Sequence, residues 1–127
     1  MIEWNRGILG ACAGHPLTDR RARVVVGDVG DVVRNNVGRL DAILLDVDNG
    51  PAAFTTLNNQ GLYDNGGVEA CHRALRPGGV LAVWSAWEDR HFEQRLRFYG
   101  FEARVDRVRA RLKKGGPRHT IFVGVKQ

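Results

Sequence analysis

The feature that most constrains the fold is a helix, a tight turn and an apolar strand that follow one another in the middle of the chain. Residues 65–75 carry apolar side chains at helical spacing, and the sequence RPGG at 76–79 then predicts the end of that helix. The next run, VLAVWSA at 80–86, is almost wholly apolar. Such strands are typical of parallel sheets, in which helices cover both faces. The unit therefore predicts an α/β fold.

Helix and strand patterns alternate along the rest of the chain. The patterns predict helices at 2–14, 29–37 and 88–99, and strands at 24–26 and 41–47. Strands that alternate with helices pair in parallel through right-handed crossovers. The last two apolar runs, 101–110 and 119–126, are joined by a glycine-rich turn, which predicts an antiparallel hairpin. The whole pattern predicts one domain over residues 1–127, with an open, mostly parallel sheet and this hairpin at one edge.

The composition is that of an ordinary globular protein, with 43% hydrophobic and 26% charged residues. The sequence has no apolar run of the length that a membrane-spanning helix needs, and its first residues, MIEWNRGILG, lack the pattern of a signal peptide. Cys12 and Cys71 are far apart and fit reduced thiols better than a disulfide framework. These features favour a cytoplasmic protein.

Polar side chains follow three of the predicted strands, at Asp28, Asp46 and Ser85. In open α/β sheets, ligands bind outside the carboxyl ends of the strands, so these residues are candidates for a binding site. Two interpretations of Asp28 stay open. It accepts hydrogen bonds from a ligand, or it caps the helix that begins at Val29, and both can hold at once.

Asp46 is the strongest candidate of the three. It follows the apolar run Ile43–Leu45, and a carboxylate is costly to bury at the end of a central strand unless it is paired. The position favours a general base or an amine-binding anion over a loop carboxylate held by backbone amides. Asp48 and Asn49 are better explained as ordinary turn residues, because a Gly-Pro pair follows them.

Three segments together resemble a known group of enzymes. They are GDVGDVV at 27–33, LDAILLDVDNGP at 40–51 and GLYDNGGVEACHRALRPGGVLAVWS at 61–85. They resemble class I S-adenosylmethionine-dependent transferases, and among these the spermidine synthase-like proteins of the aminopropyltransferase type. The resemblance extends from about residue 2 to residue 125 and implies a Rossmann-like fold.

The resemblance also implies roles for individual residues. Asp28 matches the acid that contacts the adenine amino group of the cofactor, and the backbone amide of Val29 reads the adenine ring. Asp46 matches the acid that orients and deprotonates the attacking amine. Asp48 matches a second acid of the same loop, and Tyr63 an aromatic residue on the substrate side. The implied cofactor is S-adenosylmethionine or its decarboxylated form, without a metal.

The sequence departs from this group at its N-terminal end. The glycine-rich cofactor loop that opens the fold is missing, since ILGACAG at 8–14 has neither an apolar strand before it nor the right spacing. The first two strands are therefore expected to be absent, which weakens cofactor binding and makes the chain a C-terminal portion of the fold. The missing strands normally lie between 24–26 and 41–47. We expect a homodimer through the open edge of the sheet or a gapped sheet, rather than direct pairing of these two strands.

The function implied by the resemblance is transfer of an aminopropyl group to a small-molecule amine, with Asp46 as base or anchor. Two alternatives stay open: methyl transfer from S-adenosylmethionine to another small molecule, and a non-catalytic fragment or interaction module. The basic residues between Arg104 and Arg118 suit a charge-protected sheet edge better than a nucleic-acid surface. The four histidines lack the spacing of metal ligands, so no metal site is expected.

Overall fold

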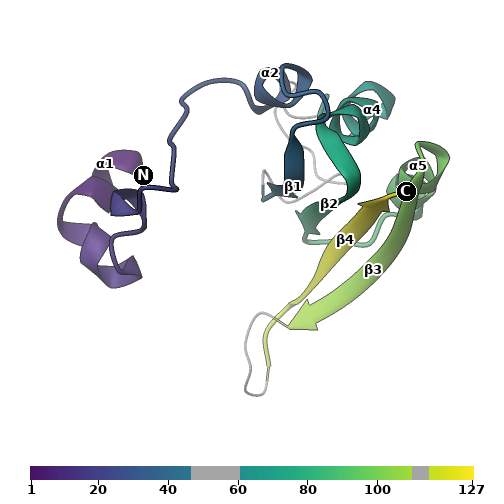
Figure 1. The fold of residues 1–127 in the computed structure, drawn as a ribbon. Coiled ribbons are helices and arrows are strands. Elements are labelled where there is room, and N and C mark those ends of the chain that lie inside the picture. Colours follow the sequence, from purple (N-terminus) through teal and green to yellow (C-terminus); the bar gives the residue numbers. More distant parts are fainter. Residues whose placement is uncertain (47–60, 110–114) are drawn as a thin grey trace.

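The computed structural model describes residues 1–46, 61–109 and 115–127. In these ranges four strands form one mixed sheet in the order β1-β2-β4-β3 (Figure 1). The strands are β1 (Leu40–Leu45), β2 (Leu75–Ser85), β3 (Phe101–Arg109) and β4 (Arg118–Lys126). The helices are α1 (Ile2–Arg6), α2 (Val29–Arg34), α4 (Asn65–Ala74) and α5 (Arg90–Phe98), with 3₁₀ helices at Ile8–Ala13 and Pro16–Thr18. β1 and β2 are parallel, whereas β4 is antiparallel to both β2 and β3. The α/β class and the C-terminal hairpin are therefore confirmed.

The second strand begins earlier than its sequence predicts. We expected RPGG to separate helix from strand, but β2 already starts at Leu75, which lies opposite Leu40. The register then shifts, because the next pair is Ala42 with Val80. The extra residues form an irregularity in which Gly78 has a φ of 78°, a left-handed conformation that glycine adopts without strain.

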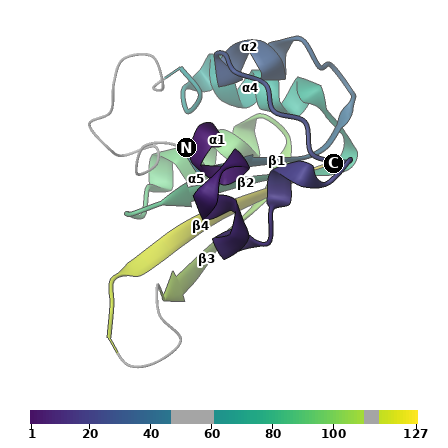
Figure 2. The same cartoon turned by 90° about the vertical axis from the view of Figure 1, so that its left-hand side faces the viewer.

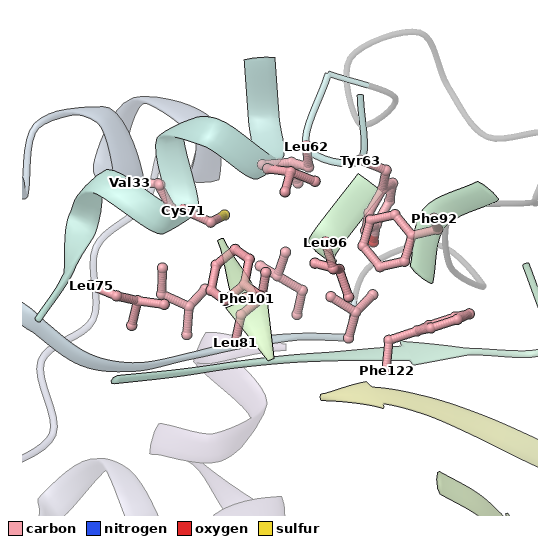
Figure 3. Close-up of a cluster of buried hydrophobic side chains, with 14 of the residues drawn as sticks. Val33, Leu62, Tyr63, Cys71, Leu75, Leu81, Phe92, Leu96, Phe101 and Phe122 are labelled. Carbon is pink, nitrogen blue, oxygen red and sulfur yellow. The ribbon is translucent and has the colours of Figure 1, made fainter. Parts of the chain in front are cut away.

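The core lies between one face of the sheet and the helices α4 and α5 (Figure 3). Phe92 of α5 stands edge-on to Phe122 of β4, with ring centroids 5.0 Å apart. Leu81, Leu96 and Leu75 are fully buried in the same core. Phe92 and Leu96 form the buried side of α5. This packing fixes α4 and α5 against the sheet and so determines where their first residues lie.

Each of the helices α2, α4 and α5 begins at an aspartate that accepts a hydrogen bond from the backbone N–H three residues later. The residues are Asp28, Asp64 and Asp89, and the bonds measure 3.1, 2.8 and 3.1 Å. Such caps satisfy one of the backbone donors that a helix start leaves unpaired.

Within the described ranges, no helix is long and apolar enough to cross a membrane.

The N-terminal segment differs from the expectation. The helix expected at 2–14 is divided into α1 and a 3₁₀ helix, and Gly7 lies between them. The expected strand at 24–26 is wrong, because these residues pair with no strand in the described part of the chain and Val26 is 84% exposed. The segment stands apart from the sheet, beyond the β1 edge (Figures 1 and 2). Direct pairing of 24–26 with β1 therefore does not occur.

The two thiols differ in their surroundings, which gives a first testable prediction. Burial raises the pKa of the Cys71 thiol to about 11, whereas Cys12 is exposed. Because the thiolate is the reactive form, we expect Ellman's reagent to modify Cys12 quickly and Cys71 only after unfolding. A Cys12→Ser variant should then show no fast reaction in native buffer. Equal reaction rates at both cysteines in the folded chain would contradict the burial of Cys71.

Candidate functional site

The candidate site lies at the carboxyl ends of β1 and β2. Because these strands are parallel, with Leu45 beside Val83, their last residues reach the same edge of the sheet. The backbone N–H of Gly38 donates to the Arg73 carbonyl over 2.8 Å, which joins the chain after α2 to the end of α4. Both helices therefore end where the strands begin. The capped first residues of α2 and α4 therefore lie at the other end of the strands, beside the carboxyl ends of β1 and β2.

Asp46 is the first residue after β1 and lies at this edge. Its side chain is exposed, and it forms no hydrogen bond or ion pair with any of the residues that the structure describes. The alternative of a carboxylate held by backbone amides therefore has no support among these residues. An exposed, unpaired carboxylate keeps its lone pairs available for a proton or an ammonium group.

Asp28 and Val29 lie at the start of α2. The Oδ1 atom of Asp28 accepts the Asp31 N–H, so the predicted helix cap is confirmed. Both residues are exposed. The N–H of Val29 belongs to the first helical turn, which has no acceptor within the helix. This position leaves the carboxylate and the amide accessible to a ligand, and the expected contact with adenine stays a prediction.

Tyr63 lies in the core rather than on an open surface. It is only 4% exposed, and its ring stands edge-on to Phe92 with centroids 6.0 Å apart. Its expected role on the substrate side therefore stays a prediction that the present position of the ring does not favour. Asp48, the second expected acid, lies outside the described residues.

A half-buried arginine fixes the segment that leads into α4. The Nη1 atom of Arg95 donates to the Tyr63 carbonyl over 2.6 Å, and its Nε atom donates to Asn65 Oδ1 over 2.9 Å. We expect Arg95→Met to lower the free energy of unfolding by about 1.5–3 kcal/mol, because hydrogen bonds from a charged donor are lost. Urea denaturation measures this change. Arg90→Met on the exposed side of the same helix should shift stability by less than about 0.5 kcal/mol, and equal losses would contradict the bridging role.

The end of β2 contributes Ser85, which the sequence had indicated, and Glu88, which it had not. Ser85 is buried, and its hydroxyl donates to the Trp87 carbonyl over 2.7 Å while accepting the Trp87 N–H over 3.2 Å. This turn brings Glu88 to the surface, where it pairs with Arg107 of β3. The hydrogen bond from Arg107 lowers the pKa of Glu88, so this carboxylate stays charged at neutral pH.

Several carboxylates therefore gather at one edge of the sheet. We call this set the acidic rim, and its members are Asp28, Asp46, Asp64, Glu88 and Asp89. Asp64 carried a recognisable signal, since it directly precedes the helix predicted at 65–75, the position of a cap. Asp89 lies inside the helix predicted at 88–99, and its capping role follows from the later start of α5 at Arg90. Asp28, Asp64 and Asp89 of this rim cap helices, and Glu88 pairs with Arg107. Within the described ranges, no group of histidine, cysteine and acidic side chains is arranged to hold a metal ion.

Comparison with known proteins concerns the fold. No protein-family model and no curated protein matches the sequence. Among solved structures, the chain is similar to spermidine synthase from Thermotoga maritima, with 20% identity and a TM-score of 0.71 over 99% of this chain and 41% of that one. A spermidine synthase in complex with the transition state analogue AdoDATO is also similar, with 21% identity and a TM-score of 0.71. This match covers 99% of this chain and 43% of that one.

A methyltransferase is also similar. The 1,6-didemethyltoxoflavin-N1-methyltransferase of Burkholderia thailandensis, solved with 1,6-didemethyltoxoflavin and S-adenosylhomocysteine, gives 18% identity and a TM-score of 0.59 over 94% of this chain and 56% of that one. The chain spans less than half the length of either spermidine synthase. It therefore has a spermidine synthase-like, class I S-adenosylmethionine-dependent transferase fold, of which it spans a part.

Proposed function

We propose that the chain carries the acceptor side of a transferase that moves an aminopropyl group from decarboxylated S-adenosylmethionine to an amine. The observation that supports this most is the exposed carboxylate of Asp46 at the carboxyl end of a parallel strand, which has no hydrogen-bond or ion-pair partner among the residues that the structure describes. Ligands of open α/β sheets bind at this edge, and a base must be accessible to the group that it deprotonates.

In the proposed reaction, the amine nitrogen attacks the carbon next to the sulfonium sulfur. A bond forms between nitrogen and carbon, the carbon–sulfur bond breaks, and the electron pair of that bond goes to sulfur. Asp46 orients the amine and takes its proton. Holding the two reactants in line lowers the barrier, because the entropy of bringing them together is then lost on binding.

The acidic rim supports a cationic acceptor. Carboxylates on one edge of a sheet attract positively charged amines and raise their local concentration. Asp28 and Val29 are assigned to the adenine of the donor, by the resemblance of GDVGDVV to cofactor-binding segments. Asp48 and Tyr63 remain proposed substrate contacts on the same basis.

Methyl transfer is the second candidate, supported by the likeness to the Burkholderia thailandensis methyltransferase. A transfer assay separates the two. The chain is incubated with a set of diamines and one of two donors, decarboxylated S-adenosylmethionine or S-adenosylmethionine. Mass spectrometry then measures the masses of the products. We expect aminopropylated diamine with the decarboxylated donor. Methylated product with the other donor would favour the methyltransferase, and no product with either donor would favour a non-catalytic module.

A further inference from the structure

The free end of the β3–β4 hairpin extends beyond the rest of the sheet. β2 pairs with β4 as far as Thr120, whereas β3 and β4 continue to pair with each other as far as Arg109 and Arg118. Among the residues that the structure describes, this end of the hairpin is therefore a two-stranded ribbon with no third strand beside it. Figure 1 shows the hairpin projecting away from the helices.

Two arginines face each other at the end of this ribbon. Arg109 of β3 and Arg118 of β4 are directly opposite in the register, so their side chains lie on the same face, and both are exposed. Like charges in this position repel each other and destabilise the pairing of the two strands. An anion between the two guanidinium groups removes this repulsion, because each group can donate a pair of hydrogen bonds to it.

Neither of these arginines forms an ion pair with a carboxylate among the described residues. Arg107, two residues earlier on β3, shows the contrast, because it is paired with Glu88. The sequence adds no acid nearby, since residues 109–118 include five basic residues and no acidic one. The described end of the hairpin therefore carries positive charge that no carboxylate of the described residues balances.

Protection of the sheet edge, which the sequence favours for these charges, does not account for the pair. Charged side chains on β3 are expected on that ground, because β3 is an edge strand of the sheet. Arg118 belongs to β4, which lies between β2 and β3 in the strand order. A cation there, opposite Arg109, adds repulsion between the two strands without adding to the protection of the edge.

The surface beside the two arginines is an open hollow of about 250 Å³. Gly115 and Gly116 line it together with the arginines, and glycine has no side chain that would cover the guanidinium groups. An open, projecting pair of cations fits the phosphates of a polymer better than a small ion, which needs an enclosed site. We propose that the end of the β3–β4 hairpin binds the phosphate backbone of duplex DNA, with Arg109 and Arg118 as phosphate contacts.

The shape of the hairpin favours a duplex over a single strand. The major groove of B-form DNA is wide enough to admit a two-stranded β-ribbon. Proteins that bind single strands use exposed aromatic side chains on which the bases stack. The described residues 108–109 and 115–119 offer no such side chain, because His119 is half-buried and its ring lies 5.0 Å from that of Trp84. Contacts to phosphates carry no sequence information, so we expect binding that is independent of base sequence.

The test uses the whole chain of 127 residues and a fluorescently labelled DNA duplex, with anisotropy as the readout. We expect a Kd of about 10⁻⁴ to 10⁻⁶ M at physiological salt and a steep loss of affinity as salt is raised, because bound phosphates release their counterions. A single strand of the same sequence should bind more weakly. Absence of binding at low salt, tighter binding of the single strand, or a preference for anionic lipid vesicles over the duplex would each overturn the proposal.

A double substitution sharpens the test. Arg109→Gln with Arg118→Gln is expected to weaken binding at least about tenfold and to reduce the slope of log K against log salt by about 2, one for each phosphate contact. The variant also removes the repulsion between the strands, so its free energy of unfolding should not fall, as urea denaturation verifies. Undiminished binding by this variant would overturn the proposal.

The matched control removes the same charge from another part of the chain. Arg20→Gln with Arg23→Gln changes two exposed residues of the N-terminal segment and should leave affinity and salt slope unaltered. Equal losses in the two double variants would overturn the proposal, because net charge alone would then account for binding. Asp46→Asn should bind the duplex normally, since the hairpin site is separate from the proposed transfer reaction.

Discussion

Asp46→Asn is expected to lower the rate of transfer by about 10²- to 10⁴-fold, the usual contribution of a positioned general base. The asparagine keeps the size of the side chain but cannot take the proton of the amine. Because Asp46 is exposed and unpaired in the described part of the chain, the free energy of unfolding should change by less than about 0.5 kcal/mol. Initial rates at saturating donor measure the first effect, and urea denaturation measures the second.

The control for this variant is an acid on the same strand. Asp41 is exposed near the opposite end of β1, where it pairs with Arg76 over 2.9 Å. Asp41→Asn removes the same charge from the chain, but not from the edge where the strand ends. We expect it to leave the rate of transfer unchanged. Equal losses in the two variants would mean that charge alone, rather than position, accounts for the effect.

Gly67→Ala is expected to destabilise the chain by about 3 kcal/mol, at the upper end of the range for overpacking. A Cβ atom at Gly67 would lie 2.2 Å from the Gly61 carbonyl oxygen and 2.4 Å from the carbonyl group of Leu62. These are backbone atoms, so the segment before α4 must move, and the buried Tyr63 must move with it. The gain of about 1 kcal/mol from the better helix propensity of alanine is smaller. Urea denaturation followed by circular dichroism measures the difference.

The neighbouring glycine is a matched control. Among the described residues, a Cβ atom at Gly66 would meet Asp64 Oδ1 alone, at 3.5 Å, which is an ordinary contact. Gly66→Ala should therefore stabilise the chain by about 0.5–1 kcal/mol through helix propensity. Opposite signs for adjacent glycines of one helix would establish the close approach of α4 to the preceding segment. Stabilisation by both substitutions would show that this approach is looser than described.

The parts of the fold that were predictable from sequence are those fixed by local patterns. The apolar run before Ser85, the helix with Phe92 and Leu96 on one side, and the C-terminal hairpin all depend on periodicity and turn residues within about ten positions. Asp28 as a helix cap is equally local. These features do not require knowledge of distant neighbours.

The errors concern residues whose state depends on long-range contacts. The valines at 24–26 have the composition of a strand, but a strand forms only where another strand accepts its hydrogen bonds, and none is beside them in the described residues. The burial of Tyr63 was not evident from the sequence, because it depends on packing against Phe92 of α5, and its expected substrate contact stays a prediction. No local sequence pattern marked Glu88 as a residue of the candidate site, because its partner Arg107 lies on another strand.

The most direct test of a donor site at this edge is calorimetric titration of decarboxylated S-adenosylmethionine and S-adenosylmethionine into the chain. We predict binding tighter than about 1 mM, near −4 kcal/mol, that is lost in Asp28→Ala. Because that variant also removes a helix cap, Asp89→Ala, which removes the cap of α5, is the matched control and should bind normally. No heat with either ligand, or equal binding by Asp28→Ala, would contradict a donor site at the start of α2.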